Sequence, residues 1–348
     1  MRKIRLGKTG LSVTKTSFGA LPIQRLTVED AADILRAARD AGVNYFDTAR
    51  AYSDSEHKLS VAFAGLPRDQ VIIATKTGAK NAEIMRTHLA ESLSTLGTAY
   101  IDVYQFHNPP FIPKPGGEDG LYDAASAARD AGQIRFIGIT QHSLEGAFQA
   151  VESGLYDVLQ YPFNHLATER EIALVRLCAE KNIGFVAMKA MSGGLITDAA
   201  IPFAYISTFE NVVPIWGIQR KSELEQFIRL EAELPQIDDA MRKRIEKDRR
   251  ELAGAFCRSC GYCLPCPADI PIPMANRITQ LLTRSPSAQW LTDEWRKNME
   301  KVEQCMHCGL CESRCPYNLK PYETMPDQLR FYRESAKKFD MEQKNVLR

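Results

Sequence analysis

Short apolar runs alternate with amphipathic stretches along most of the chain, and this alternation limits the possible folds more than any other feature of the sequence. Each run is bounded by turn-forming or polar residues, as is typical of buried parallel strands. The stretches between the runs carry apolar residues at helical spacing, for example in 28–41, 82–96, 144–151 and 169–181. The eight predicted strands are residues 16–19, 43–47, 71–76, 101–107, 134–140, 158–161, 183–188 and 212–217.

Eight strand–helix units in succession predict an α/β fold, a (β/α)8 TIM barrel. The alternative is an open doubly wound sheet, which normally carries a glycine fingerprint after its first strand. Here the first strand is followed by Gly-Ala-Leu-Pro at 19–22, which does not fit that fingerprint, so the barrel is favoured. Residues 3–14 contain turn-forming Gly7 and Gly10 and are predicted to form a hairpin that closes the bottom of the barrel.

The charge balance of the 348-residue chain is nearly even, because 44 Lys and Arg residues against 43 Asp and Glu residues give a formal net charge of +1. A chain so close to neutral is not expected to bind nucleic acid or an anionic membrane through bulk charge. It contains no stretch of about 18 apolar residues, so no membrane span is predicted. The basic start lacks the apolar run of a secretory signal, and we therefore expect a cytoplasmic protein.

Cysteine is distributed very unevenly, which separates the tail from the rest of the chain. Eight of the nine cysteines lie between residues 257 and 315, and the ninth, Cys178, stands on an apolar helical face where a core thiol is expected. We therefore predict a barrel over 1–235, a connecting helix over 236–252 and a cysteine-rich domain over 253–348. Within this tail, 274–282 and 293–302 show helical spacing, and Trp290 and Trp295 are expected to anchor the packing.

Polar residues capable of acid–base chemistry stand at the ends of three consecutive predicted strands. Asp47 ends the second strand, Lys76 the third and His107 the fourth, while Tyr52 follows in the loop after the second. Barrel enzymes act at the carboxyl ends of their strands, and neighbouring strands are only about 4.8 Å apart, so these side chains can converge. A tyrosine beside an ammonium is a better acid, because the positive charge favours the phenolate. The set predicts a site that protonates a carbonyl oxygen while hydride reaches its carbon.

These residues resemble a known catalytic tetrad. The segments Phe46-Asp47-Thr48-Ala49-x-x-Tyr52, Thr75-Lys76 and Phe106-His107-Asn108-Pro109 are similar to those of the aldo/keto reductase superfamily, and the resemblance extends over about residues 1–235. It implies a (β/α)8 barrel that binds a nicotinamide coenzyme across its mouth without a Rossmann fold. It also implies that Tyr52 is the general acid, that Lys76 tunes it, that Asp47 pairs with Lys76, and that His107 orients the carbonyl.

The same resemblance implies contacts to the coenzyme, with several departures from the family pattern. A glutamine at 141 stands where the family has an asparagine on the nicotinamide carboxamide, and a methionine at 188 replaces an aromatic residue that stacks on the ring. The family's arginine for a 2′-phosphate aligns with Glu223, so NADPH and NADH both stay open. The implied coenzyme-binding residues are Gln141, Gln160, Met188, Lys189, Gly193, Gly217 and Arg220.

The tail contains two cysteine runs, Cys257-x2-Cys260-x2-Cys263-x2-Cys266-Pro267 and Cys305-x2-Cys308-x2-Cys311-x3-Cys315-Pro316. The second has the spacing of bacterial ferredoxins, in which the last cysteine of each run ligates the other cluster. This predicts one [4Fe-4S] cluster on Cys257, Cys260, Cys263 and Cys315 and a second on Cys305, Cys308, Cys311 and Cys266. Zinc is the alternative, because zinc sites made of four cysteines use the same short spacing. Disulfides are not expected in a reducing compartment.

The two runs also resemble the ferredoxin-like C-terminal domain of one branch of the aldo/keto reductases. Together the features predict an oxidoreductase that reversibly reduces an aldehyde, ketone or sugar carbonyl with a nicotinamide coenzyme. The clusters carry single electrons and hydride carries two, so coupling them requires a flavin or a partner that splits the pair. The sequence shows no flavin motif, and the clusters are either structural or serve a ferredoxin-type electron carrier. Two alternatives stay open: an iron–sulfur electron-transfer protein with the barrel as scaffold, and a non-catalytic redox or nucleotide sensor.

Overall fold

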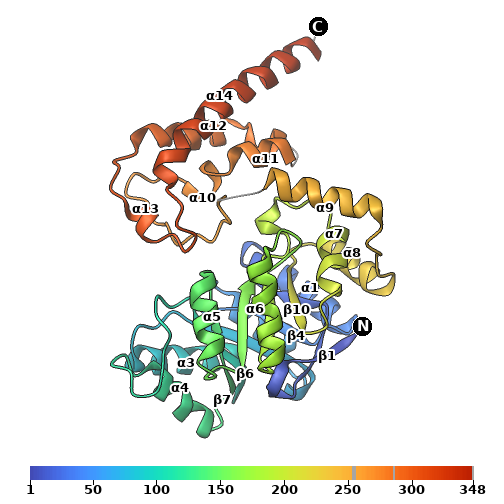
Figure 1. Cartoon of the computed structure of the whole chain (residues 1–348), viewed down its shortest axis with the longest axis vertical. Coiled ribbons are helices and arrows are strands. Elements are labelled where there is room, and N and C mark those ends of the chain that lie inside the picture. Colours follow the sequence, from blue (N-terminus) through green and yellow to red (C-terminus); the bar gives the residue numbers. More distant parts are fainter. Residues whose placement is uncertain (253–255, 285–286, 347–348) are drawn as a thin grey trace. The chain divides into compact units, whose positions relative to one another are not determined.

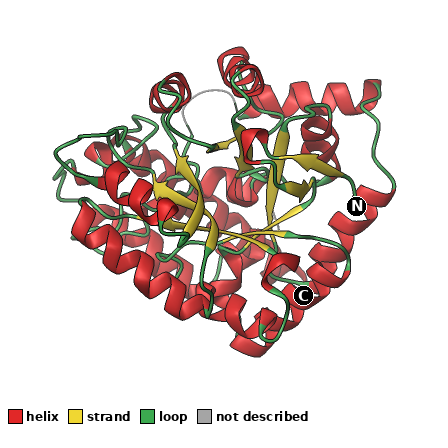
Figure 2. Cartoon of the chain, turned by 90° about the horizontal axis from the view of Figure 1, so that it is seen from below, coloured by secondary structure: helices red, strands yellow, loops and turns green. Residues whose placement is uncertain are grey.

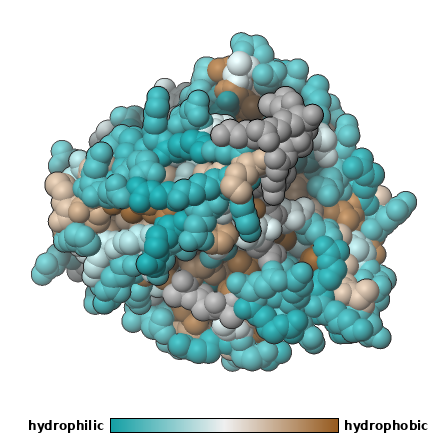
Figure 3. Space-filling model, turned by 90° about the horizontal axis from the view of Figure 1, so that it is seen from above, coloured by the Kyte–Doolittle hydropathy of each residue, from teal (hydrophilic) through white to brown (hydrophobic). Residues whose placement is uncertain are grey.

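The computed structural model describes residues 1–252, 256–284 and 287–346. These residues form two compact units. The first consists of Met1–Ala190 with Ala199–Ile245, and the second of Met191–Asp198 with Glu246–Arg348. None of the helices in the described residues is long and apolar enough to cross a membrane. Hydrophilic residues cover most of the face drawn in Figure 3.

The first unit is a barrel of parallel strands surrounded by helices (Figure 1, Figure 2). Within the described residues, eight strands pair in the order β10-β3-β4-β5-β6-β7-β8-β9, which closes the sheet on itself. Each strand coincides with a predicted apolar run, with ends that differ by two residues at most, so the TIM barrel prediction is confirmed. The strands are β3 (Ser17–Gly19), β4 (Tyr45–Asp47), β5 (Ile72–Thr77), β6 (Ile101–His107), β7 (Ile134–Thr140), β8 (Val158–Pro162), β9 (Gly184–Met188) and β10 (Val212–Gly217).

Helices follow the strands around the outside of the barrel, and polar caps define where several of them begin. The side chains of Thr27, Asn81, Ser143 and Thr168 each accept a hydrogen bond from a backbone N–H of the first turn. Gly97 ends one helix with a φ of 63°, the left-handed conformation that glycine adopts at little cost. The helices are α1 (Val28–Asp40), α2 (Ser55–Phe63), α3 (Ala82–Leu96), α4 (Leu121–Asp130), α5 (Leu144–Glu152), α6 (Glu169–Glu180), α7 (Ala200–Ser207) and α8 (Lys221–Ala232).

A hairpin of β1 (Lys3–Arg5) and β2 (Ser12–Thr14) precedes the barrel, as predicted. Its buried Leu6 and Leu11 belong to the apolar cluster that fills the barrel interior. A Cβ at Gly184, the first residue of β9, would lie 2.7 Å from the Leu6 side chain. The hairpin therefore covers the amino-terminal ends of the strands, and it closes the end of the barrel opposite the predicted site.

The interior packing explains why the predicted site residues meet. Side chains alternate between the two faces of a strand, so residues two positions apart point the same way. The apolar cluster inside the barrel includes Tyr45, Ala74, Val103, Val158 and Val186. Two positions further along the same strands stand Asp47, Lys76, Gln105, Gln160 and Met188. These polar and soft side chains form the next layer, at the carboxyl ends of the strands.

The second unit is helical. It is entered through α9 (Asp239–Glu251), which begins in the first unit and ends in the second. Its further helices and 3-10 segments are α10 (Ile272–Ala275), α11 (Ile278–Arg284), η5 (Ser287–Trp290), α12 (Asp293–Glu300), η6 (Lys301–Gln304), α13 (Leu310–Ser313) and α14 (Pro321–Val346).

The single helix predicted over 274–282 is wrong, because α10 ends at Ala275 and α11 begins at Ile278. At the break, the side-chain oxygen of Asn276 accepts a hydrogen bond from Thr324 of α14. The expected packing role of the two tryptophans is confirmed, since the rings of Trp290 and Trp295 pack edge to face with centres 4.9 Å apart.

Candidate functional site

An ion pair lies at the carboxyl end of the barrel. Lys76 Nζ donates to Asp47 Oδ2 at 2.6 Å and to the Thr48 carbonyl oxygen at 2.6 Å. Both charged side chains are almost fully buried, with 1% of Lys76 and 3% of Asp47 exposed. Burial lowers the pKa of Lys76, which Asp47 opposes, and burial raises the pKa of Asp47, which Lys76 opposes. At this distance each charge is the main compensation for the burial of the other.

Tyr52 and His107 complete a cluster around this lysine. Lys76 Nζ lies 5.4 Å from the centre of the Tyr52 ring. The ring centres of Tyr52 and His107 are 5.9 Å apart, with 81° between the ring planes. The turn after β4 holds the tyrosine, whose N–H donates to the Ala49 carbonyl at 2.9 Å. The structure therefore brings together all four residues of the predicted tetrad, including Asp47.

His107 at the end of β6 is held in its neutral form. Burial, and then the positive charge of Lys76, lower the pKa of His107 to about 3. A neutral imidazole carries one N–H donor and one acceptor nitrogen. His107 can therefore donate a hydrogen bond to a carbonyl oxygen at neutral pH without carrying a charge.

Gln105 is a buried residue of this site that the sequence-based prediction missed. Its Nε2 donates to Asp47 Oδ1 at 3.3 Å and to Gln160 Oε1 at 3.0 Å. A signal for it exists in the sequence, because Gln105 precedes His107 by two residues and therefore shares its face of β6. A polar side chain on the inner face of an apolar strand marks a residue of the site.

Glu56 is a second buried polar residue that was missed. Its Oε1 accepts a hydrogen bond from Thr75 Oγ1 at 2.6 Å, and burial raises the pKa of Glu56. The negative charge of Glu56 also acts on Lys76, in the same direction as that of Asp47. No sequence signal separates this glutamate, which stands on α2, from the acidic residues of an exposed helix.

The two glutamines implied at the coenzyme, Gln141 and Gln160, make contacts within the protein. The Gln160 side chain hydrogen bonds to Asp47 and accepts from Gln105, so it is part of the tetrad network. Gln141 is buried, and its Nε2 donates to the Pro109 carbonyl at 3.1 Å. The coenzyme contacts of both residues stay predictions.

Four other residues implied at the coenzyme are divided between the two units. Met188 and Gly217 end β9 and β10. Lys189 follows β9 in the left-handed region, with a φ of 57°. Gly193 belongs to the second unit, where its carbonyl accepts a hydrogen bond from Arg277 Nη2 at 2.9 Å. Gly193 therefore has a binding partner in the cysteine-rich unit.

Arg220, also expected near the coenzyme, precedes α8 with 71% of its side chain exposed. The carboxylate of Glu223 folds back over the start of this helix. Its Oε2 accepts from the N–H of Gln219 at 2.9 Å and from that of Arg220 at 3.1 Å, and its Oε1 lies 4.0 Å from Arg220 Nη1. Free N–H groups at a helix start attract anions. Glu223 already accepts from two such groups, those of Gln219 and Arg220 just before α8.

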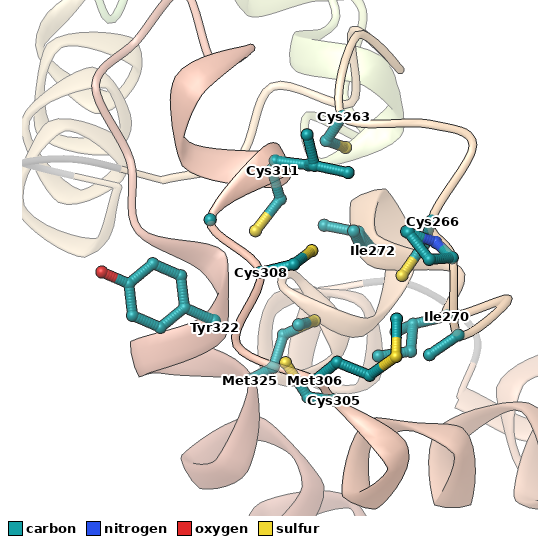
Figure 4. Close-up of a pocket in the computed structure, with 14 residues that line it drawn as sticks. Cys263, Cys266, Ile270, Ile272, Cys305, Met306, Cys308, Cys311, Tyr322 and Met325 are labelled. Atoms are coloured by element: carbon teal, nitrogen blue, oxygen red, sulfur yellow. The ribbon is translucent and has the colours of Figure 1, made fainter.

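The cysteines of the two runs gather around two cavities in the second unit. The first cavity, of about 380 Å³, is lined by Cys263, Cys266, Cys305, Cys308 and Cys311 (Figure 4). The second, of about 330 Å³, is lined by Cys257, Cys260, Cys263, Cys311 and Cys315. Each cavity thus receives the four-cysteine set predicted for one cluster, and Cys263 and Cys311 line both.

The surroundings of these thiols suit a cluster better than a zinc ion. Ser259 donates its backbone N–H to Cys257 Sγ at 3.4 Å, a kind of hydrogen bond that tunes the potential of a cluster. In the part of the chain that the structure describes, no three His, Cys, Asp or Glu side chains are placed to hold a single metal ion. Zinc needs four sulfurs about 2.3 Å from one ion, whereas a cubane spreads its four ligands over four irons.

The remaining thiol lies in the barrel. Cys178 of α6 is fully buried, as predicted for a core residue, and burial raises its pKa to about 12. A thiol with so high a pKa is not ionised at neutral pH, and it is therefore a poor nucleophile.

Comparison with known proteins agrees with both parts of the chain. Residues 14–213 match the Aldo/keto reductase family, and residues 256–320 match a 4Fe-4S dicluster domain. The L-galactose dehydrogenase of Arabidopsis thaliana is 30% identical over 215 residues, which are 57% of this chain and 67% of the relative. The NADH-specific methylglyoxal reductase of Escherichia coli is 27% identical over 263 residues, which are 66% of this chain and 79% of the relative.

Solved structures share the barrel fold. An aldo-keto reductase from Klebsiella pneumoniae in complex with NADPH aligns with a TM-score of 0.61 at 19% identity, covering 71% of this chain and 94% of that one. A holo aldo-keto reductase from Bacillus halodurans aligns with a TM-score of 0.60 at 19% identity, covering 71% of this chain and 96% of that one. With the family match over more than half of its length, the chain belongs to the aldo/keto reductase family as an oxidoreductase of that type, and it carries a C-terminal 4Fe-4S dicluster domain.

Proposed function

We propose that the barrel catalyses the reversible reduction of an aldehyde, ketone or sugar carbonyl with a nicotinamide coenzyme. The observation that carries this proposal is the convergence of Asp47, Tyr52, Lys76 and His107 at the carboxyl end of the barrel. When bound, the coenzyme supplies hydride to the carbonyl carbon. Similar proteins include an L-galactose dehydrogenase and a methylglyoxal reductase, which favours a small carbonyl or sugar substrate.

The residues of the chain supply the proton. The Tyr52 O–H donates it to the carbonyl oxygen as negative charge develops there, and the nearby Lys76 ammonium favours the phenolate left behind. Asp47 keeps the lysine charged and in place through the contact at 2.6 Å. The neutral His107 donates a hydrogen bond to the same oxygen and orients the carbonyl.

We infer that NADH is preferred over NADPH. A 2′-phosphate bound at the start of α8 would meet the Glu223 carboxylate, which already accepts the N–H groups of Gln219 and Arg220. Like charges at such short range repel, and the exposed Arg220 side chain compensates only in part. The NADH specificity in the name of the Escherichia coli relative favours the same choice.

For the second unit we propose two [4Fe-4S] clusters with crossed ligands. The cavity lined by Cys257, Cys260 and Cys263 takes its fourth ligand from Cys315, and the cavity lined by the second run takes its fourth from Cys266. Each cluster accepts one electron at a time. The cluster on Cys305, Cys308, Cys311 and Cys266 includes the exposed Cys308 among its ligands. This exposure favours electron exchange with a ferredoxin-type carrier at that cluster.

The experiment that tests the barrel proposal compares Tyr52→Phe with Tyr100→Phe under anaerobic conditions. Tyr100 precedes β6, at the other end of the barrel, and its ring lies under the Arg68 guanidinium. The Tyr52 variant should lose about 10²–10⁴-fold in kcat for carbonyl reduction while still binding NADH. The Tyr100 variant should keep the wild-type rate. Unchanged reduction by the Tyr52 variant would instead favour the electron-transfer or sensor alternatives.

A further inference from the structure

Arg277 is the most unusual charged residue of the second unit. It lies between α10 and α11, and only 1% of its surface is exposed. Its Nη2 donates to the Gly193 carbonyl at 2.9 Å. The other two guanidinium nitrogens, Nε and Nη1, are buried and have no hydrogen-bond acceptor among the described residues.

A buried cation without an anionic partner is costly, so the burial of Arg277 indicates a negative charge nearby. A guanidinium stays protonated in proteins, although burial lowers the pKa of Arg277. Taking such a charge out of water costs several kcal/mol unless an anion compensates it. Two buried guanidinium nitrogens without an acceptor among the described residues therefore mark a place where an acceptor carrying negative charge is expected.

The contacts of Arg277 place it beside the first cysteine run. Asn276, its neighbour in the chain, lines the cavity that Cys257 and Cys315 line. Gly193, which accepts the hydrogen bond of Arg277, lies against Ser259 of that run, because a Cβ at Gly193 would be 3.6 Å from the Ser259 Cβ. A Cβ at Gly193 would lie 2.9 Å from Arg277 Nη1 and 3.5 Å from the Arg258 carbonyl oxygen. Arg277, the Gly193 loop and the first cysteine run therefore meet at one point of the second unit.

We propose that Arg277 is the counter-ion of the cluster on Cys257, Cys260, Cys263 and Cys315, and that it raises the reduction potential of that cluster. The inference rests on the two-cluster ligation proposed above. Four thiolates already give the cluster a negative charge, and reduction by one electron from an external donor adds another. A fixed cation with N–H donors toward the sulfurs stabilises the reduced state more than the oxidised one, because net charge and hydrogen bonds to sulfur set the potential.

The same guanidinium ties a loop of the barrel sequence to this cluster. Met191–Asp198 leaves β9 and returns to α7, yet it belongs to the second unit. Its Gly193 has a φ of 64°, and a Cβ there would force Arg277 Nη1 to shift. Gly193 is thus a positioning residue, whose carbonyl oxygen accepts a hydrogen bond from Arg277 Nη2. The N–H groups on Nε and Nη1 are left for the cluster.

The test is an anaerobic redox titration of the full-length chain with reconstituted clusters, followed by EPR. Arg277→Gln and Arg277→Met remove the charge, and Arg277→Lys keeps it. Arg296→Gln is the control, because Arg296 pairs with Asp340 in the same unit and lines neither cavity. We expect the Gln and Met variants to shift the equilibrium of one cluster at least tenfold toward the oxidised form, about 59 mV lower for a one-electron couple. The other cluster should not shift, and the Lys variant should shift less.

Unchanged potentials in fully loaded Gln and Met variants would overturn the inference, and so would an equal shift of both clusters. Loss of one cluster from these two variants, with full loading of the Lys variant, would also support a required positive charge. Loss from the Lys variant as well would contradict it. Hydrogen exchange of the 191–198 segment should increase in all three Arg277 variants, and unchanged exchange would refute the tie to Gly193. An iron content far from about eight in the wild type would instead refute the two-cluster proposal.

Discussion

The buried ion pair of Asp47 and Lys76 allows the sharpest test of the barrel, through the single substitution Asp47→Asn. This change keeps the shape of the side chain but leaves the Lys76 ammonium, which is 1% exposed, with neutral hydrogen-bond partners and with the charge of Glu56 as its remaining compensation. Removing one member of a buried ion pair costs about 3–5 kcal/mol in free energy of unfolding. For a unit of this size about 2–4 °C is lost per kcal/mol, so the melting temperature should fall by about 6–20 °C.

The pH dependence of this loss has a definite sign. Burial already lowers the pKa of Lys76 from its ordinary value of 10.5, and without Asp47 it must fall further. A base with a lowered pKa in the folded state destabilises the fold at low pH, because the unfolded chain binds the proton more tightly. The deficit of Asp47→Asn should therefore be complete below the lowered pKa of Lys76 in the variant, and it should shrink as the pH rises from that value toward 10.5.

The assay is thermal unfolding of the anaerobic protein followed by circular dichroism, with two controls. In Asp102→Asn, a buried carboxylate that pairs with Arg68 and Arg135 is lost away from the tetrad, so stability should fall while carbonyl reduction persists. Asp47→Asn/Lys76→Met removes both charges of the pair, so most of the lost stability should return, while carbonyl reduction should be lost with the lysine. A double variant as unstable as the sum of the two single variants would refute the ion-pair reasoning.

Three further predictions concern the site residues. His107 has a pKa lowered to about 3 and stays neutral, so kcat should show no acid limb from imidazole between about pH 5 and 8, and a limb near the ordinary histidine pKa would contradict this. Glu223→Gln removes a negative charge at the start of α8, so it should raise kcat/KM for NADPH relative to NADH by about 2–5-fold in steady-state kinetics. An unchanged ratio would show that the coenzyme binds elsewhere. Gln105→Leu removes a hydrogen-bond donor from the buried oxygens of Asp47 and Gln160, so it should lower the free energy of unfolding by about 1–3 kcal/mol in denaturant unfolding. The control Gln133→Leu, at an exposed position before β7, should leave the free energy of unfolding unchanged.

The strands and the tetrad could be predicted because their signals are local. β6, β7 and β10 match the predicted runs to the residue, since each is a short apolar segment with polar residues on both sides. The tetrad residues could be grouped because parallel strands end at one rim of a barrel, and Asp47, Lys76 and His107 stand on the neighbouring strands β4, β5 and β6. Gln105 follows from the same alternation, once the inner face of β6 is identified.

The parts that could not be predicted depend on contacts between residues that are distant in sequence. Arginine is seldom buried, so nothing around position 277 indicates that this side chain would be hidden or that Gly193 would accept its hydrogen bond. The break between α10 and α11 accompanies a contact of Asn276 with Thr324, 48 residues later. Glu56 likewise becomes part of the site only because α2 packs it against Thr75 of β5.

The most direct test of the proposed reaction follows one deuterium atom. NADH carrying deuterium at the transferable position is incubated anaerobically with the enzyme and a panel of aldehydes, ketones and sugars, and the products are analysed by mass spectrometry. Transfer through the tetrad predicts one deuterium on the former carbonyl carbon with wild-type enzyme, and loss of that product with Tyr52→Phe. Product without deuterium, or reduction driven by dithionite through the clusters when NADH is omitted, would contradict hydride transfer in the barrel.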